Sequence, residues 1–483
     1  MITNLFLSAT IGLFLTVATM AQKVGDIKTV PYTFVTNNGQ KVEAELGSLY
    51  VPERHGKPNG KLIELAFVRF KSTAKISSFP IVYLAGGPGG SGISLAKGAR
   101  FPLFMAMHEI GDVIALDQRG TGLSKPNLAC QEKLNYPLDR PTEKAKAIQL
   151  YRDKSKSCAQ FWLKQGVDLT AYNTNENADD LDVLRKALGV EKITLWGSSY
   201  GTHLGLAFIR RHEKNVYRAV FSGVEGMDDT FKLPGTLDAQ LKLVSDLVKH
   251  DANLREKIPD LTDLVKRVFG KLENTPVQVE TKDGKITLGK FDLQQLAIAL
   301  LGDREGKEVL PAVFYDFDKG AWDSPYVKYF SQFIAQQRRG ELGSPMAFAM
   351  DCASFASTQR LDRINRESKT SLLGDSLDFP FPDVCTAWGN LKLDDSFRRP
   401  VRSNVKVLFL SGTFDGRTPP GNVQELLKGF PNGQHVLIEG AGHGNELFIS
   451  SPQIKDVMIE FMRDRPLSTK TITLPPIKFQ SIR

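Results

Sequence analysis

A serine flanked by glycines is the first feature of this sequence that points to chemistry. Gly197-Ser198-Ser199-Tyr200-Gly201 fits the pattern G-x-S-x-G, in which the serine occupies a strained turn between a strand and a helix. The flanking glycines remove side chains that would collide at such a turn. The apolar stretch 193–196 precedes the motif, and a helical pattern follows it. We therefore predict that Ser199 is a nucleophile.

A serine hydroxyl needs a base at neutral pH, and a carboxylate must orient that base. With this motif, the acid and then the histidine follow the serine in the chain. His443 lies in the glycine-rich loop 440–444 after a strand, whereas His435 falls inside that strand. Asp415 ends the preceding apolar strand. We predict that Asp415 and His443 complete a catalytic triad with Ser199.

Attack on a carbonyl group also needs donors for the negative charge that grows on its oxygen. We predict that these are the backbone N–H groups of Tyr200, next to the nucleophile, and of Gly87 in the glycine-rich loop 86–92. This loop also matches G-x-G-x-x-G, a dinucleotide-binding pattern. Pro88 offers no N–H to a phosphate, and Arg100-Phe-Pro102 interrupts the helix that such a site requires. We therefore favour the oxyanion interpretation.

These residues need elements that hold them together, and the chain predicts strands that alternate with helices. A turn at 37–39 separates the first two strands. The expected strands are 32–36, 42–51, 62–70, 80–85, 112–117, 193–196, 216–222, 405–411 and 435–439, and the expected helices include 179–188, 200–211, 237–248 and 261–269. Apolar strands alternating with helices indicate an α/β fold with a mostly parallel central sheet and helices on both faces.

Residues 226–400, which we call the cap segment, differ from the rest of the chain in being rich in amphipathic helical patterns. A structureless loop of that length is implausible in a compact domain. We predict a mainly helical cap domain, inserted between residues 22–225 and 401–483, which form the two parts of one core.

The N-terminal residues 1–21 contain no charged side chain, and an apolar run from Leu5 to Val17 leads to small residues ending at Ala21. This pattern predicts a signal peptide and an exported protein, secreted or periplasmic, without a stable membrane span after cleavage. An uncleaved anchor is the alternative, because no Lys or Arg opens the segment and its length is close to the roughly 20 residues of a spanning helix.

Four cysteines follow this segment, and an even number in an exported chain argues for two disulfides. Of the three possible connectivities we favour Cys130–Cys158 and Cys352–Cys385, because these pairs close short loops in separate regions. No C-x-x-C pair suggests a zinc site.

The charge balance is mildly basic, with 62 Lys and Arg against 54 Asp and Glu. Basic and acidic residues are interleaved, which favours a solvated surface over a polyanion-binding face. We therefore expect no nucleic-acid partner. A hydrophobic fraction of 41% with 24% charged residues excludes collagen-like, coiled-coil and wholly disordered chains.

Five motifs together resemble the serine α/β-hydrolase family of prolyl aminopeptidases (proline iminopeptidases) and secreted tripeptidyl aminopeptidases. They are AGGPGGSG at 85–92, DQRGTG at 117–122, WGSSYG at 196–201, SGTFD at 411–415 and GAGH at 440–443. Ala85 stands where the prolyl branch commonly has histidine, and the export signal with two cysteine pairs is more similar to the tripeptidyl branch. The resemblance implies an α/β-hydrolase fold with a helical cap, release of an N-terminal residue (often proline) or a tripeptide, and no metal or organic cofactor.

Such an exopeptidase must hold the free ammonium group of its peptide substrate, and carboxylates near a desolvated site do this best. Glu225, Asp228 and Asp229 follow the strand after the nucleophile helix, and we predict that they reach over the cleft, Glu225 foremost. Arg119 in the DQRG turn is expected to brace the glycine loop by hydrogen bonds.

Two other functions fit parts of the pattern. A secreted carboxylesterase or lipase would use the same triad. A catalytically inactive scaffold that binds another molecule is disfavoured, because every triad and oxyanion position is filled. The sequence leaves open the length of the released fragment, the preferred N-terminal residue and the oligomeric state.

Overall fold

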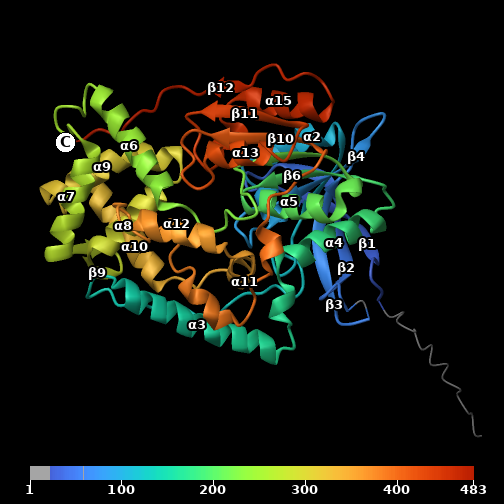
Figure 1. Cartoon of the computed structure of the whole chain (residues 1–483), viewed down its shortest axis with the longest axis horizontal. Helices are drawn as coiled ribbons and strands as arrows, with labels where there is room; N and C mark the ends of the chain where they lie inside the picture. The colour runs from blue at the N-terminus through green and yellow to red at the C-terminus, as the bar shows by residue number, and fades with distance from the viewer. Residues whose placement is uncertain (1–21, 58, 483) are drawn as a thin grey trace, which may run out of the picture.

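A ten-stranded sheet runs through the computed structural model, which describes residues 22–57 and 59–482 (Figure 1). The predicted signal peptide, residues 1–21, lies outside the described residues. The strands follow the order β1-β2-β3-β5-β4-β6-β7-β10-β11-β12. Their bounds are β1 (Ile27–Val35), β2 (Lys41–Pro52), β3 (Leu62–Phe70), β4 (Ser78–Leu84), β5 (Gly111–Leu116), β6 (Ile193–Ser198), β7 (Val216–Ser222), β10 (Lys406–Gly412), β11 (Gly433–Glu439) and β12 (Thr471–Thr473).

The sheet has an antiparallel edge and a parallel centre. Strands β1, β2, β3 and β5 pair antiparallel, and all pairs from β5 to β12 are parallel. The carboxyl ends of β6, β7 and β10 therefore meet at one edge of the sheet, where ligands bind in folds of this kind. This arrangement confirms the predicted α/β class and its mostly parallel sheet.

Helices cover both faces of the sheet, each face closing its own hydrophobic core. On one face lie α3 (Lys144–Lys164), α4 (Thr174–Ala187), α5 (Tyr200–His212) and α13 (Pro420–Leu427). On the other lie α1 (Gly92–Ala96), α2 (Phe101–His108), α14 (Glu446–Ile449) and α15 (Pro452–Met462). The break between α1 and α2 contains Arg100, where the sequence predicted an interrupted helix.

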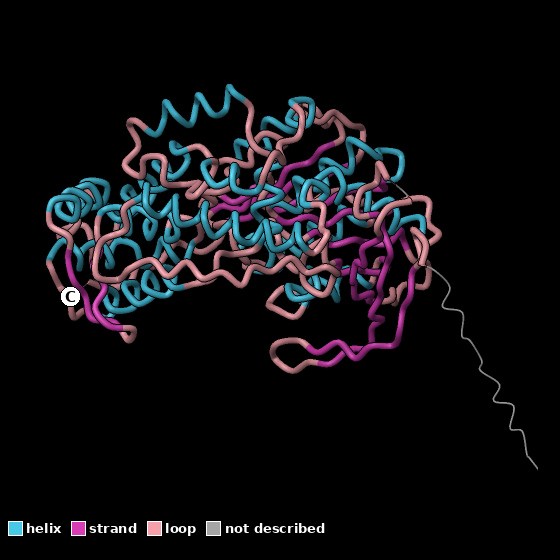
Figure 2. Tube along the Cα trace, turned by 90° about the horizontal axis from the view of Figure 1, so that it is seen from below, coloured by secondary structure: helices cyan, strands magenta, loops and turns pink. Residues whose placement is uncertain are grey.

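The cap segment is mainly helical and includes one β-hairpin. Figure 2 shows this hairpin at the end of the molecule opposite the large sheet. The elements are α6 (Pro234–His250), α7 (Leu261–Asn274), β8 (Val277–Thr281), β9 (Gly284–Leu288), α8 (Lys290–Leu300), α9 (Arg304–Lys319), α10 (Pro325–Arg339), α11 (Pro345–Ser354) and α12 (Thr358–Ser368).

Two cores divide the cap segment. Apolar residues of α6 to α10 and of the hairpin share a core of their own. Helix α11 instead packs onto the α/β core through Met346, Phe348 and Ala349. The part of the cap segment that contains α11 is therefore continuous with the sheet's packing, and the rest forms a separate body beside it.

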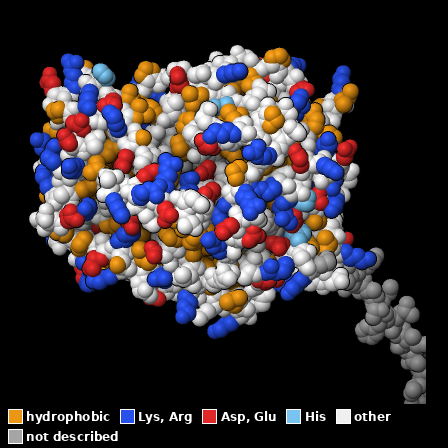
Figure 3. All heavy atoms as spheres, viewed as in Figure 1, with side chains coloured by type: hydrophobic (Ala, Val, Ile, Leu, Met, Phe, Trp, Pro, Cys, Tyr) orange, Lys and Arg blue, Asp and Glu red, His pale blue; other side chains and the backbone are white. Residues whose placement is uncertain are grey.

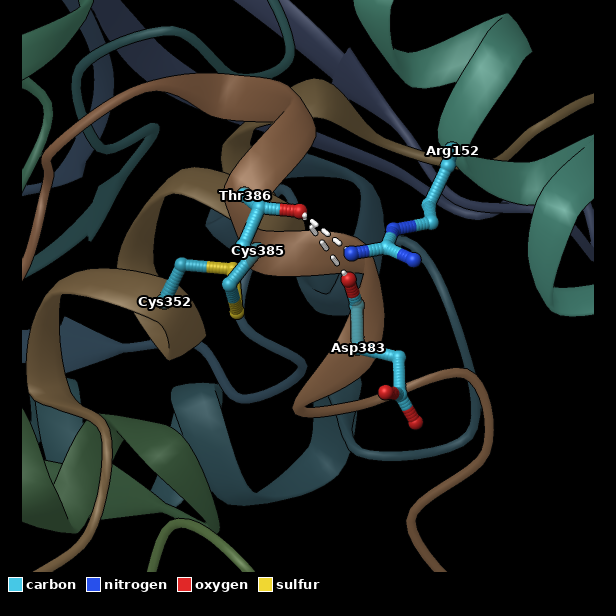
Figure 4. Close-up of a disulfide and its surroundings, with 5 residues drawn as sticks. All are labelled: Arg152, Cys352, Asp383, Cys385 and Thr386. Carbon is cyan, nitrogen blue, oxygen red and sulfur yellow. Dashed lines mark hydrogen bonds between the residues drawn. A yellow bond between two sulfur atoms is a disulfide. The ribbon is translucent and has the colours of Figure 1, made fainter.

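Both disulfides have the predicted connectivity. Cys130 is joined to Cys158 of α3, and Cys352 of α11 is joined to Cys385. Close to the second bridge, Arg152 of α3 donates to the Thr386 hydroxyl over 3.0 Å (Figure 4). Helix α11 is thus fastened at its C-terminal end to the short helix 383–388.

The surface in Figure 3 shows Lys and Arg side chains interspersed with Asp and Glu, as the interleaved sequence suggested. Across residues 22–57 and 59–482, no helix combines the length and the apolar character that crossing a membrane requires.

Candidate active site

Ser199 stands at a sharp turn between β6 and α5. Its backbone has φ 53° and ψ −124°, a left-handed conformation that costs energy for a residue with a side chain. A Cβ atom added at Gly197 would lie 2.7 Å from the Gly201 oxygen, and one added at Gly201 would lie 2.0 Å from the Leu84 oxygen. Both glycines of the motif are therefore required by close backbone contacts.

Ser199, His443 and Asp415 form one hydrogen-bonded chain, although they come from three separate loops. His443 Nε2 lies 3.0 Å from Ser199 Oγ, and His443 Nδ1 lies 2.9 Å from Asp415 Oδ2. The loops follow β6, β10 and β11, which are close neighbours in the sheet. These distances are those of a base that can take a hydroxyl proton while a carboxylate holds its other nitrogen.

Asp415 is fully buried and accepts four hydrogen bonds. Its Oδ1 accepts the backbone N–H groups of Arg417 and Thr418, each over 2.8 Å. Its Oδ2 accepts the Thr418 hydroxyl over 2.6 Å in addition to His443. Burial alone would raise the pKa of Asp415, but the charge and hydrogen bond of His443 together with Thr418 lower it to about 2. The carboxylate is therefore ionised at neutral pH.

Thr418 is a part of this site that the sequence analysis missed. Its hydroxyl lies 3.0 Å from His443 Nδ1 as well as bonding Asp415. A threonine three residues after a carboxylate is a common local capping pattern. Because Asp415 was already predicted to be the catalytic acid, this spacing could have identified Thr418 as its partner.

The glycine-rich loop passes directly against the nucleophile. A Cβ atom at Gly86 would lie 2.7 Å from the Ser198 oxygen and 2.9 Å from Ser199 Cβ. Gly90 donates its N–H to the Gly86 oxygen over 3.1 Å, which closes the loop on itself. Tyr200, the first residue of α5, has no acceptor for its N–H within the helix. The glycine-rich loop therefore lies against Ser199 at Gly86, the residue before Gly87, and the Tyr200 N–H has no acceptor within α5.

Arg119 has a structural role, as expected, but its partners are not those predicted. Its guanidinium is fully buried and binds Asp180 with Nε and Nη2, at 2.7 Å and 2.6 Å. Its Nη1 donates to the backbone carbonyl oxygens of Glu53 and Ala171. Arg119 therefore joins α4 to the end of β2, and none of these hydrogen bonds goes to the glycine loop.

The neighbours of Arg119 in the DQRG turn hold the glycine loop instead. Asp117 accepts the Ser91 hydroxyl over 2.6 Å and the Ile93 N–H over 3.1 Å. Gln118 donates to the Ala85 oxygen over 2.9 Å. The turn braces the loop as expected, but through a carboxylate and an amide that reach it directly.

The three predicted amine-binding acids already have partners. Glu225 is buried, and its carboxylate pairs with Lys232 Nζ at 2.7 Å. Asp228 accepts the N–H and hydroxyl of Ser357, at 2.7 Å and 2.6 Å.

Asp229 pairs with Arg360 at 2.6 Å. Of the three acids, Glu225 is tied most closely to the nucleophile. Its backbone N–H donates to the Thr202 hydroxyl over 2.8 Å, and this hydroxyl donates to the backbone carbonyl oxygen of Ser199 over 2.7 Å.

Helix α11 brings a further acid to this region, which the sequence analysis missed. Ser344, at its start, lies against Gly89 of the glycine loop. Ser354, at its end, lies 3.1 Å from Nε2 of the buried His203, on the helix that begins after the nucleophile. Asp351 lies on α11 between these contacts. Burial, followed by the charge of Glu225, raises the pKa of its carboxyl well above the usual range.

The charge of Glu225 thus acts on the Asp351 carboxyl, and Lys232 pairs with Glu225 at 2.7 Å. No local sequence signal marks Asp351, because its place depends on how α11 folds back onto the core.

The chain matches the family described as alpha/beta hydrolase fold over residues 80–447, which contain Ser199, Asp415 and His443. Among curated proteins, the serine protease Hip1 of Mycobacterium tuberculosis is 32% identical over 184 residues. That match spans 37% of this chain and 35% of the length of Hip1.

Longer and more distant matches also occur. The tripeptidyl aminopeptidase of Streptomyces lividans is 24% identical over 486 residues, covering 89% of this chain and 84% of that protein. The proline iminopeptidase of Arabidopsis thaliana is 23% identical over 180 residues, covering 37% of this chain and 35% of that protein.

Proposed function

Since this chain belongs to the alpha/beta hydrolase fold family, we propose that it is a serine exopeptidase that releases an N-terminal residue, often proline, or a tripeptide from peptides with a free N-terminus. The observation that carries this proposal is the unbroken chain of hydrogen bonds from Asp415 through His443 to Ser199. A serine protease, a tripeptidyl aminopeptidase and a proline iminopeptidase among its relatives favour peptides over other acyl substrates.

In the first half of the proposed reaction, Ser199 Oγ attacks the scissile carbonyl carbon while His443 Nε2 takes the hydroxyl proton. Asp415 stabilises the imidazolium that forms and keeps its ring oriented. The oxyanion accepts hydrogen bonds from the backbone N–H groups of Gly87 and Tyr200. The tetrahedral intermediate then collapses, the C–N bond breaks, and the amine leaves with the proton from His443.

In the second half, water replaces the departed amine. His443 takes a proton from this water, its oxygen attacks the acyl carbon, and the ester bond to Ser199 breaks as the serine recovers its proton. The free N-terminal fragment leaves with a new carboxylate. Each proton passes through one imidazole, so the reaction needs no further acid or base.

We propose that Glu225 and Asp351 hold the substrate's ammonium group. Two carboxylates close together, one buried and one half-buried, are unfavourable without a cation, and the raised pKa of Asp351 reflects this cost. Lys232 balances one of the two charges. An incoming ammonium would balance the other and restore ionised Asp351. All three predicted acids have partners, but only Glu225 is shown joined to the turn of Ser199, through the Thr202 hydroxyl, so we assign the primary role to Glu225 and Asp351.

A panel of anilide substrates tests the activity. Substrates would carry one, two or three residues, each with a free or an acetylated amine, and would be assayed with the native protein and with Ser199→Ala. We expect release of the aniline only from free-amine substrates and only by the native protein. Cleavage of p-nitrophenyl esters with no cleavage of any anilide would instead identify a carboxylesterase or lipase.

Three variants test the amine site. We expect Glu225→Gln and Asp351→Asn each to raise KM for a free-amine anilide by about 10- to 100-fold, since each removes one charge-assisted contact to a desolvated cation. Hydrolysis of a p-nitrophenyl ester without an amine should change little. Asp323→Asn is the matched control, because the Asp323 side chain is fully exposed in the same segment. Equal losses on both substrates would contradict the amine-binding role.

We also propose that the protein is exported and loses residues 1–21. The two disulfides support this, because they persist in oxidising compartments. The N-terminal sequence and mass of the protein recovered from the exported fraction test it. A mature chain that starts at Met1 in the membrane fraction would favour the uncleaved anchor.

A further inference from the structure

A lysine of the cap segment is fully buried beside the candidate acid. Lys307 lies in α9 and has no exposed surface. Its ammonium group donates to the Leu301 oxygen, to the Asp303 oxygen at 3.4 Å and to the Phe414 oxygen at 2.7 Å. Phe414 directly precedes Asp415 in the chain. All three N–H donors of the lysine thus go to backbone carbonyls, one of which belongs to the loop that bears the acid.

The turn 301–303, whose carbonyl groups bind Lys307, also contacts the loop of His443. Gly302, between two of the lysine's acceptors, accepts the backbone N–H of His443 over 3.1 Å. A Cβ atom at Gly442 would lie 2.6 Å from Asp303 Cα, so the histidine loop and the cap segment approach as closely as backbones can. The turn 301–303 therefore contacts both catalytic loops, and Lys307 closes this turn.

The groups that face Lys307 come from three sides. Asp415 and Arg417 belong to the loop after β10, Asp303 precedes α9, and Glu446 begins α14. The ring of Phe414 lies 5.9 Å from the ammonium. Burial lowers the pKa of Lys307 to about 8, against the opposing effect of the surrounding carboxylates, Asp415 first among them. Lys307 is therefore mostly protonated at neutral pH and loses its charge in mildly alkaline solution.

We propose that Lys307 is a positioning residue for the triad: its three hydrogen bonds join the loop of Asp415 to the turn that holds His443, so that the cap segment sets the geometry of both. This inference rests on the proposed roles of Asp415 and His443. The lysine itself touches no reacting atom, and it acts through the Phe414 carbonyl and the 301–303 turn.

A neutral amine has two N–H donors for three carbonyls. One buried carbonyl then loses its partner, which is costly, and the joined loops loosen. Deprotonation of Lys307 should therefore slow the nucleophile as the pH rises through about 8. An arginine at this position stays charged at such pH values and should remove this dependence.

The rate of labelling by a fluorophosphonate probe tests the inference. In that reaction Ser199 Oγ bonds to phosphorus, fluoride leaves, and His443 takes the serine proton. The probe carries no amine, so the titration of a substrate's N-terminus does not enter. Rates would be measured between about pH 7 and about pH 10 for the native protein, Lys307→Arg, Lys307→Met and Lys319→Met. The last is the matched control, an exposed lysine at the end of the same helix.

We expect the native rate to fall as the pH rises through about 8 and the Lys307→Arg rate to stay level. Lys307→Met should be slower than the native protein by about 10- to 100-fold near pH 7, the cost of a small displacement of catalytic groups. Its rate should show no break near pH 8, so the difference from the native protein should shrink as the pH rises. Lys319→Met should match the native protein. Near-ultraviolet circular dichroism would verify that each variant is folded.

Two results would overturn the inference. One is a folded Lys307→Met whose rate and pH profile match the native protein. The other is a native rate that does not fall between about pH 7 and about pH 10, which decides the matter even where neither variant folds. Labelling of Ser199→Ala distinguishes a failure of this inference from a failure of the proposed function. If Ser199→Ala is labelled as fast as the native protein, the proposed triad is contradicted. If it is not labelled, the two results above contradict only the role of Lys307.

Discussion

Replacing Asp415 with asparagine should nearly abolish activity while leaving the fold intact. The asparagine has the same shape, and its oxygen can still accept the N–H groups of Arg417 and Thr418 that now bind Oδ1. Its amide nitrogen then faces His443 Nδ1, where Oδ2 stood at 2.9 Å. Because an amide nitrogen donates, Nδ1 must accept, and the imidazole proton moves to Nε2.

That tautomer cannot take the proton of Ser199, since Nε2 already carries one. We therefore expect kcat to fall by about 10⁴-fold, which corresponds to about 5.5 kcal/mol of transition-state stabilisation. KM should change little, because Asp415 does not meet the substrate.

The assay is kcat and KM on the best free-amine anilide, with the fluorophosphonate labelling rate as a second measure of the nucleophile. Thermal unfolding serves as the control for folding. A folded Asp415→Asn whose kcat stays within about tenfold of the native value would refute the proposed function of this acid.

Three further predictions concern the frame of the site. Thr418→Val removes the hydroxyl that bonds Asp415 Oδ2 over 2.6 Å; we expect kcat to fall by about tenfold, since hydrogen bonds to charged groups contribute about 1.5–3 kcal/mol, and an unchanged kcat would assign Thr418 to folding alone. Gly201→Ala should abolish folding or shift the nucleophile, because its Cβ would lie 2.0 Å from the Leu84 oxygen; a protein with native thermal stability and native labelling would contradict the turn described above. Acid should destabilise the native protein through Asp415, because its pKa of about 2 in the folded protein lies below the ordinary value. Ionised Asp415 contributes about 2–3 kcal/mol to the free energy of unfolding; this contribution is complete above about pH 4 and is lost as the pH falls through about 2. Urea unfolding of the native protein and Asp415→Asn at several pH values would measure it, and equal pH dependence of the two would count against it.

Much of the fold could be predicted from the chain alone because its signals are local. Apolar runs predicted the strands to within a few residues, for example 216–222, which is β7 in full. The two glycines around Ser199 reflect the backbone geometry of one turn, and Asp415 and His443 could be found because each follows an apolar strand. Such features leave a trace in a few neighbouring residues, and the structure brings the three side chains together as expected.

Features that depend on distant partners could not be predicted in this way. Arg119 meets Asp180, which lies 61 positions further along the chain, whereas the sequence analysis placed its partners in the glycine loop. The acids after β7 were recognisable as acids, but their partners Lys232, Ser357 and Arg360 come partly from the far end of the cap segment. Lys307 was overlooked for the same reason, because its partner Phe414 is 107 positions away.

The most direct test of the whole account is to identify the residue that the fluorophosphonate modifies. After reaction of the folded protein, digestion and mass spectrometry of the peptides should place one phosphonyl group on Ser199, and His443→Ala should abolish this labelling. Modification of a different residue, or labelling of Ser199 that survives intact in His443→Ala, would contradict the triad on which the proposed activity depends.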